Sequence, residues 1–221
     1  LFVADRCPYS TLVREALCSL DVDAHVFPCP EWADDNRDRL HQRGGKIQVP
    51  FLVDRTSGFR SYESNAIVNY LFARFAKQRP PAYLRGALGK RLAKISRRLV
   101  DARPLEPNPR RRPPQPLELW GYEASPYTRR VREALDSAAI DYVSRAIPRR
   151  SPRRPAFALA TGKTQFPYLV DKNENLGLFE SGQIVTHISD CYDSWDPLED
   201  ALVGTFPASD PPAATQHIVS H

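Results

Sequence analysis

A cysteine opens the first pattern in this chain that could support chemistry. Residues 7–10 read Cys-Pro-Tyr-Ser, and an apolar stripe of helical spacing follows from Leu12. Pro8 suits the first position of a helix, where its missing N–H costs nothing. A cysteine directly before a helix lies near unpaired N–H groups and the positive end of the helix dipole, which stabilise a thiolate. The pattern predicts a nucleophilic sulfur at Cys7, and Arg6 adds a nearby positive charge.

The same pattern returns 118 residues later with a serine in place of the cysteine. Residues 125–128 read Ser-Pro-Tyr-Thr. Three further landmarks return at an offset of 118 or 117: Val-Arg-Glu-Ala-Leu at 13–17 and 131–135, Val-Pro-Phe-Leu-Val-Asp at 49–54 as Phe-Pro-Tyr-Leu-Val-Asp at 166–171, and Glu-Ser at 63–64 and 180–181. A repeat of this length indicates a duplicated domain rather than a solenoid of short units.

Hydrophobic periodicity predicts the order βαβαββα in each repeat. The first repeat is expected to have strands at 1–4, 24–27, 51–54 and 59–62, and helices at 8–20, 34–42 and 65–76. The second is expected to have strands at 117–122, 142–147, 166–171 and 177–179, and helices at 126–138, 155–160 and 182–192. The fold class is therefore α/β, with two tandem domains (1–78 and 117–195), a basic helix and Pro-rich linker between them (79–116) and an extended tail (196–221).

Composition bears on the membrane spans and on the redox compartment expected for the chain. Hydrophobic residues make up 42% of its 221 residues, and no window approaches the ~20 apolar residues that cross a membrane. The four cysteines have the spacing of neither a zinc site nor a disulfide framework, which fits a reducing compartment. Since the chain contains no methionine, we expect that an N-terminal segment is missing. A cleaved targeting peptide and a trimmed sequence are the two explanations.

The net charge of +5 is carried by local clusters of basic residues. A helix is expected at 82–102, with leucines on one face and basic residues on the other. It would lie either on an anionic lipid or acidic protein face, or between the two domains as a strut. Six prolines among residues 103–116 predict an extended linker. We expect the arginine clusters to contact another protein or a membrane surface: Arg110, Arg111, Arg112, Arg149, Arg150, Arg153 and Arg154. Nucleic acid is not an expected partner, because no aromatic-studded basic face accompanies them.

These motifs together resemble the thioredoxin superfamily. Cys-Pro-Tyr-Ser at the first strand–helix junction, Val-Pro before the third strand and Glu-Ser at the last helix resemble its glutaredoxin and glutathione S-transferase N-terminal branch. Phe-Pro-Cys-Pro at 27–30 and Leu-Glu-Leu-Trp-Gly-Tyr-Glu-Ala-Ser-Pro-Tyr at 117–127 look like a tandem family of chloroplasts and cyanobacteria. The resemblance covers about 1–78 and 117–195.

The resemblance implies a glutathione groove in the first repeat. Tyr9 would form one wall, and Val49, before a cis Pro50, would pair with the peptide. Glu63 and Ser64 would lie at the far end, where Ser64 caps a helix whose N–H groups suit a carboxylate. Glutathione is the ligand implied, and no cofactor is required. The corresponding second site is degenerate and comprises Ser125, Tyr127, Phe166, Pro167, Glu180 and Ser181. The fold implies a cis bond before Pro167 as well.

The chain departs from the family pattern where a second cysteine would resolve a disulfide. Ser10 and Thr128 occupy those positions, so a dithiol cycle is excluded at both motifs. Cys7 is either a monothiol nucleophile or an idle relic. Cys18 and Cys191 are expected to fill the core. A further cysteine, Cys29, is either a structural corner residue or a redox partner of Cys7. His25, His41 and His187 share no ligand spacing, so no metal site is expected.

Two functions follow from this pattern. The first is a plastid accessory or scaffold protein with degenerate glutathione-fold sites, bound to a larger, thylakoid-associated assembly such as a photosystem and peripheral to the membrane. The alternative is a monothiol glutathione-dependent oxidoreductase that uses Cys7. Conjugation of xenobiotics is not expected, because a second thioredoxin-like repeat takes the place of the helical domain that would hold the electrophile.

Overall fold

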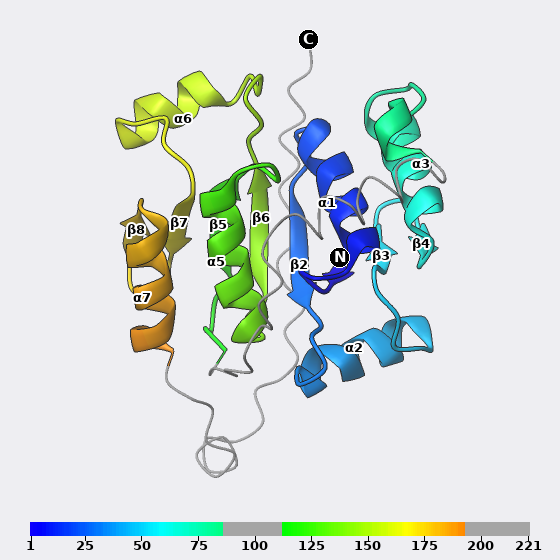
Figure 1. Cartoon of the computed structure of the whole chain (residues 1–221), viewed down its shortest axis with the longest axis horizontal. Coiled ribbons are helices and arrows are strands. Elements are labelled where there is room, and N and C mark those ends of the chain that lie inside the picture. Colours follow the sequence, from blue (N-terminus) through cyan, green and yellow to red (C-terminus); the bar gives the residue numbers. More distant parts are fainter. Residues whose placement is uncertain (86–111, 193–221) are drawn as a thin grey trace.

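The order βαβαββα occurs twice in the computed structural model, which describes residues 1–85 and 112–192 (Figure 1). The first repeat comprises β1 (Phe2–Val3), α1 (Pro8–Ser19), β2 (Ala24–Pro28), α2 (Asp34–Gly44), β3 (Leu52–Val53), β4 (Arg60–Ser61) and α3 (Ser64–Phe75). The second comprises β5 (Leu117–Gly121), α5 (Pro126–Ser137), β6 (Tyr142–Ala146), α6 (Arg154–Thr161), β7 (Tyr168–Asp171), β8 (Leu176–Leu178) and α7 (Ser181–Cys191). The elements expected within the two repeats are present, and their ends differ from expectation by up to a few residues.

Two strands from different repeats join edge to edge. The described residues form a sheet of order β1-β2-β6-β5-β7-β8, in which β2 and β6 pair antiparallel. His25 pairs with Val143, its own equivalent at an offset of 118. An approximate two-fold axis therefore passes between the repeats at this pair. The β3–β4 hairpin extends the arrangement, because Phe2 and Phe51 exchange backbone hydrogen bonds of 2.9 and 3.0 Å.

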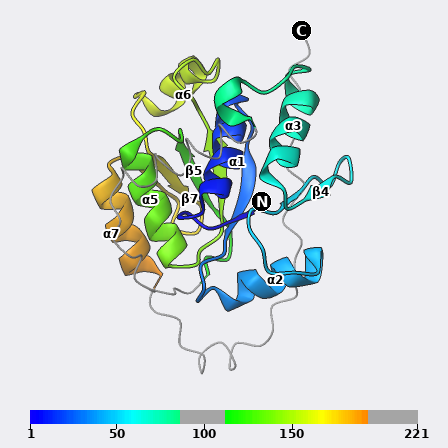
Figure 2. The same ribbon diagram turned by 45° about the vertical axis from the view of Figure 1, so that its right-hand side comes forward.

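The helices follow the same approximate symmetry. Helix α1 packs against α3 and α5 packs against α7, while α2 and α6 lie at opposite ends of the molecule (Figures 1 and 2). A hydrophobic cluster runs through both repeats and includes Val13, Leu71, Leu135 and Ile184. These apolar side chains come from the 3–4-residue spacing of each helix, so the stripe that predicted the helices also supplies the shared core.

The connecting segment starts differently from the sequence expectation. Residues Ala82–Leu84 form a 3-10 turn, and Arg85 has an extended backbone with ψ of 142°. The expected helix at 82–102 therefore does not begin at Ala82, and residues 86–102 lie outside the described residues. Leu84 is buried, as expected for the leucine face of this segment.

Four charged side chains, each at most 10% exposed, lie where the repeats meet. Arg14 of α1 reaches Glu123 of the second repeat at 3.2 Å, and Arg132 of α5 reaches Asp5 of the first repeat at 3.3 Å. Each arginine also pairs within its own repeat, Arg14 with Asp5 at 3.5 Å and Arg132 with Glu123 at 3.3 Å. The set is symmetric, because Asp5 and Glu123, like Arg14 and Arg132, are 118 residues apart. We call these four residues the charge cluster.

Pairing within the charge cluster favours the charged forms of Asp5 and Arg132. Burial raises the pKa of Asp5, but Arg14 and Arg132 outweigh that effect and hold this pKa below its usual value. Burial lowers the pKa of Arg132, and the charges of Glu123 and Asp5 outweigh it, so that the net shift is upward. Removing charges from water is costly, and four mutually paired charges offset that cost only as long as all are present.

Further polar contacts lie at either end of the boundary between the two repeats, which we call the junction. Asp21, in the turn after α1, accepts hydrogen bonds from Ser151 at 2.6 Å and from Arg153 at 2.9 Å. At the other end, Trp32 donates its indole N–H to the carbonyl of Ser137 at 3.1 Å, and Asn36 donates to Ala139 at 3.4 Å. The junction is thus fixed by the strands, the charge cluster and both flanks.

The substitution Arg132→Met should lower the free energy of unfolding by about 3–5 kcal/mol, because it leaves buried carboxylates without part of their compensation. Arg129→Met, one turn earlier on α5, should change it by less than about 1 kcal/mol, since the Arg129–Glu133 pair is more exposed. Urea denaturation measures both values. Equal effects of the two substitutions would show that the charge cluster is not a special determinant of stability.

Candidate functional site

Cys7 lies where the sequence places it, directly before α1. It is the N-cap residue, with an extended backbone (φ −80°, ψ 117°), and Pro8 is the first helical residue. Its thiol is partly exposed and donates a long contact of 3.8 Å to the carbonyl of Val49. Within the described residues, its side chain makes no capping hydrogen bond to the helix. The sulfur therefore lies at the positive end of α1 without a structural role in capping it.

The backbone of Val49, in the loop between α2 and β3, lies next to the Cys7 sulfur. The Val49–Pro50 bond is cis, as predicted, and Pro50 is buried. Phe51 stacks on Tyr62 at 4.2 Å between ring centroids, and Tyr62 donates a hydrogen bond to the carbonyl of Lys46 at 3.0 Å. These contacts fix both ends of the segment that carries Val49.

The start of α3 forms the far end of the expected groove. Glu63 is the N-cap residue and is exposed, whereas Ser64 is the first helical residue and is buried. The prediction that Ser64 caps this helix is wrong, since the structure assigns no side-chain cap to α3 among the described residues. The first N–H groups of the helix are therefore not used by Ser64. Tyr9 is partly buried in the first turn of α1.

The equivalent serine in the second repeat has a different role on the same backbone. Ser125 is the N-cap of α5, with φ of −78° and ψ of 120°. Its hydroxyl oxygen accepts a hydrogen bond from the N–H of Thr128 at 3.2 Å, and the residue is only 2% exposed. A buried oxygen that already caps a helix is a structural group, so nucleophilic chemistry at this position is not supported.

Other residues of the second site are also engaged. The guanidinium of Arg154 lies 4.8 Å from the ring of Phe166, and Glu180 accepts a hydrogen bond from Gln165. Ser181 is buried at the start of α7. Pro167 follows a cis bond, as predicted, and is buried, whereas Tyr127 is 63% exposed.

The other cysteines divide into two buried residues and one exposed residue. Cys18 is buried as predicted, and burial raises its pKa to about 11. Cys29 is buried among Phe2, Phe27 and other apolar side chains, and burial raises its pKa to about 12, which favours a structural corner residue. The prediction that Cys191 fills the core is wrong: it is exposed, because the buried stripe of α7 ends at Ile188.

The described residues contain no group of three or more potential metal ligands. His25 and His187 instead pair with single carboxylates, Asp141 at 3.0 Å and Asp171 at 2.8 Å. No helix in the described parts of the chain is long and apolar enough to cross a membrane.

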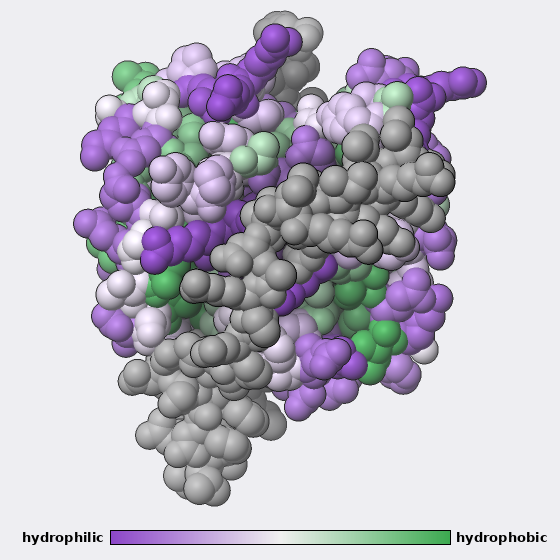
Figure 3. All heavy atoms as spheres, viewed as in Figure 1, coloured by the Kyte–Doolittle hydropathy of each residue, from purple (hydrophilic) through white to green (hydrophobic). Residues whose placement is uncertain are grey.

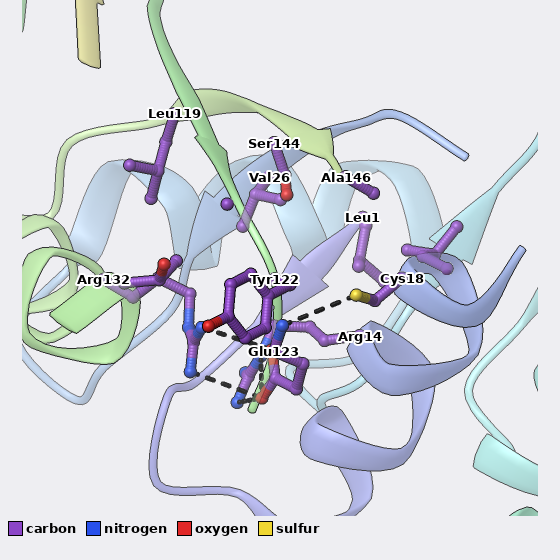
Figure 4. Close-up of a pocket in the computed structure, with 13 residues that line it drawn as sticks. Leu1, Arg14, Cys18, Val26, Leu119, Tyr122, Glu123, Arg132, Ser144 and Ala146 are labelled. Atoms are coloured by element: carbon purple, nitrogen blue, oxygen red, sulfur yellow. Dashed lines mark hydrogen bonds and ion pairs between the residues drawn. The ribbon is translucent and has the colours of Figure 1, made fainter. Parts of the chain in front are cut away.

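A small cavity of about 30 Å³ lies between the repeats, beside the charge cluster. Figure 4 shows Arg14 and Arg132 both directed at Glu123 in this cavity, and Cys18 accepts the N–H of Glu123 at 3.5 Å. Its volume suffices for about two water molecules, not for a substrate. Nearby, burial and the charge of Glu123 raise the pKa of Glu15 to about 7. Local sequence patterns did not predict this cluster, although the arginine repeated within two apolar helical motifs was a usable signal.

Several arginines that were expected to bind a partner are used within the chain. Arg112 reaches Asp141 at 3.7 Å and donates to Asn36 at 2.8 Å, and Arg153 pairs with Asp21. Arg154 donates to the carbonyl of Pro148 at 2.8 Å. These three therefore make intramolecular contacts, and the expected contact of the arginine clusters with another protein or a membrane surface stays a prediction. Arg149 and Arg150 are exposed, and Arg110 and Arg111 lie outside the described residues.

The comparison with family models agrees with this geometry. The model of the glutathione S-transferase N-terminal domain matches residues 1–80 and 119–195, which is more than half of the chain. The chain belongs to the glutathione S-transferase N-terminal domain family. Both matched segments of this family member include a Pro-initiated helix, a cis proline and a Glu-Ser helix start. Searches among curated proteins and among solved structures gave no match.

The two N-caps predict opposite responses to small substitutions. Ser125→Ala should lower the free energy of unfolding by about 1 kcal/mol, because it removes the cap of α5. Cys7→Ser should leave that free energy unchanged or raise it by up to about 1 kcal/mol, since a serine on the same backbone can cap α1. Chemical denaturation of both variants tests this pair. A loss of stability in Cys7→Ser as large as in Ser125→Ala would contradict a non-structural role for Cys7.

Proposed function

We propose that this protein is a monothiol glutathione-dependent oxidoreductase that works through Cys7. The observation that supports it is the contrast between the two N-caps. Cys7 is partly exposed and leaves its helix uncapped within the described residues, whereas Ser125 is buried and caps its helix. A position that keeps a reactive group instead of a stabilising cap is typical of a functional site.

The reaction would use one protein thiol and two steps. The Cys7 thiolate attacks the glutathione sulfur of a mixed disulfide between glutathione and a substrate thiol, so that a Cys7–glutathione S–S bond forms, the original S–S bond breaks and the substrate leaves as a thiolate. The departing thiolate takes up a proton. Glutathione thiolate then attacks the Cys7–glutathione disulfide, releases glutathione disulfide and restores Cys7. No disulfide with residue 10 can interrupt this cycle, because Ser10 has no sulfur.

The remaining residues of the groove would position glutathione. The backbone of Val49, whose carbonyl is 3.8 Å from the Cys7 sulfur, would pair with the peptide. The first N–H groups of α3 would receive a carboxylate, and the exposed Glu63 would pair with the α-ammonium group. Tyr9 and Pro50 would complete the walls. In this proposal the two repeats are tandem domains, and the second supports the first across the junction.

A second proposal is the plastid accessory role, in which the chain is a peripheral component of a larger, thylakoid-associated complex. It is favoured by the loss of the nucleophile at Ser125 and by the exposure of Arg149 and Arg150. The narrower resemblance to tandem proteins of chloroplasts and cyanobacteria supports a location in the plastid. Exposed arginines can pair with carboxylates or phosphates of a partner.

Turnover with glutathione separates the two proposals. The wild-type protein should catalyse glutathione-dependent reduction of a small mixed disulfide, and Cys7→Ser should reduce the rate to that without protein. Ser125→Ala should retain the wild-type rate, because Ser125 serves only as a cap. Absence of turnover in the wild type, or full activity in Cys7→Ser, would contradict the enzyme proposal and leave the accessory role.

A further inference from the structure

A second cysteine carries the geometry of an activated thiol. At the end of α7, the sulfur of Cys191 lies 3.2 Å from Nδ1 of His187. The other ring nitrogen of His187, Nε2, lies 2.8 Å from Oδ2 of Asp171. The side chains of His187 and Asp171 are 8% and 1% exposed, whereas Cys191 is exposed. A buried acid therefore orients a buried base towards a sulfur that solvent can reach.

The first repeat shows which part of this arrangement is structural. Its equivalent carboxylate, Asp54, accepts the N–H of Thr56 at 2.8 Å, just as Asp171 accepts the N–H of Asn173 at 2.9 Å. In the first repeat the partner of the carboxylate is the hydroxyl of Tyr70, the equivalent of His187. The acid thus holds a turn in both repeats.

The second repeat differs by two residues that together change the chemistry. Tyr70 is replaced by His187, and Arg74 by Cys191. The Tyr70 hydroxyl satisfies the carboxylate and also contacts Ser57 at 2.6 Å through the same oxygen, whereas an imidazole has a second nitrogen on the other side of its ring. That nitrogen faces Cys191, four residues later on α7. The His187–Cys191 contact is therefore not needed to hold the turn at Asp171.

The charge state of Asp171 determines which ring nitrogen of His187 donates and which one accepts a proton. Burial raises the pKa of Asp171, but hydrogen bonds from Tyr192, His187 and Asn173 outweigh it, and the net shift is downward. An ionised Asp171 accepts the Nε2–H of His187, so that Nδ1 is the acceptor that faces Cys191. Transfer of the thiol proton to Nδ1 gives a thiolate beside an imidazolium, and Asp171 stabilises the imidazolium. This is how a histidine and a carboxylate activate a cysteine nucleophile.

We propose that Cys191, His187 and Asp171 form a reactive-thiol site that accepts small disulfides of the glutathione type. In the reaction, the Cys191 thiolate attacks one sulfur of the disulfide, a protein–S–S–glutathione bond forms and the original S–S bond breaks. The leaving glutathione thiolate takes the proton held on His187. The site lies at the opposite end of α7 from Glu180 and does not depend on Cys7.

Site-resolved labelling of the full chain tests this inference. The wild type and His187→Tyr are exposed separately to iodoacetamide and to glutathione disulfide at pH 7, and modification of the Cys191 peptide is followed by mass spectrometry. His187→Tyr is the matched variant, because Tyr70 shows that a tyrosine can satisfy the carboxylate at this position. Cys191 should react about tenfold faster in the wild type, since an ordinary thiol is only a few per cent thiolate at pH 7.

The buried Cys18 reports on folding in the same samples, because it is labelled only when the core opens. If His187→Tyr exposes Cys18, His187→Gln replaces it, since its amide can also donate to Asp171. Thr186→Ala, an exposed neighbour on α7, should leave the rate unchanged. Equal rates at Cys191, within twofold, in the wild type and in a folded His187 variant would overturn the proposal.

Discussion

The antiparallel pairing of β2 with β6 is the constraint on which the rest of the structure depends. Without it, each repeat would end in an edge strand with unpaired backbone groups, which favours aggregation. The pairing also buries the charge cluster, in which the N–H of Asp5 donates to Asp136 at 3.3 Å and Arg14 contacts the carbonyl of Asp5 at 3.5 Å. Because Asp5 lies two residues before Cys7, the junction fixes the loop that carries the candidate nucleophile.

The first helix of each repeat starts with the same backbone conformation, but the N-cap residues have different uses. Cys7 and Ser125 have φ and ψ values within a few degrees of each other, yet only the serine caps its helix. Further divergence follows the same pattern, since Arg154 lies over Phe166 and Glu180 is bonded to Gln165 at the degenerate site. Where Figure 3 shows described residues, hydrophilic side chains predominate and the apolar ones form separate patches.

Local patterns in the sequence were sufficient for the elements within the two repeats, the two cis prolines and the position of Cys7. These features are encoded by hydrophobic periodicity and by turn residues, and both involve only a few neighbouring positions. The contacts between the repeats were not predictable in this way. Arg14 and Arg132 belong to helical motifs and Arg153 to a basic cluster, and nothing local indicates that the partner of each is a carboxylate more than 100 residues away. Cys191 was misplaced for a related reason, since its environment depends on where α7 ends and on His187.

Native-state hydrogen exchange tests the dependence on the junction most directly. If the junction holds the fold together, the amides hydrogen-bonded between β2 and β6 exchange only through global unfolding. Their exchange free energy should then equal the free energy of unfolding measured by denaturation. Exchange of these amides at a clearly lower free energy, while amides in α1 and α5 remain protected, would show that the repeats separate without unfolding and would contradict the account.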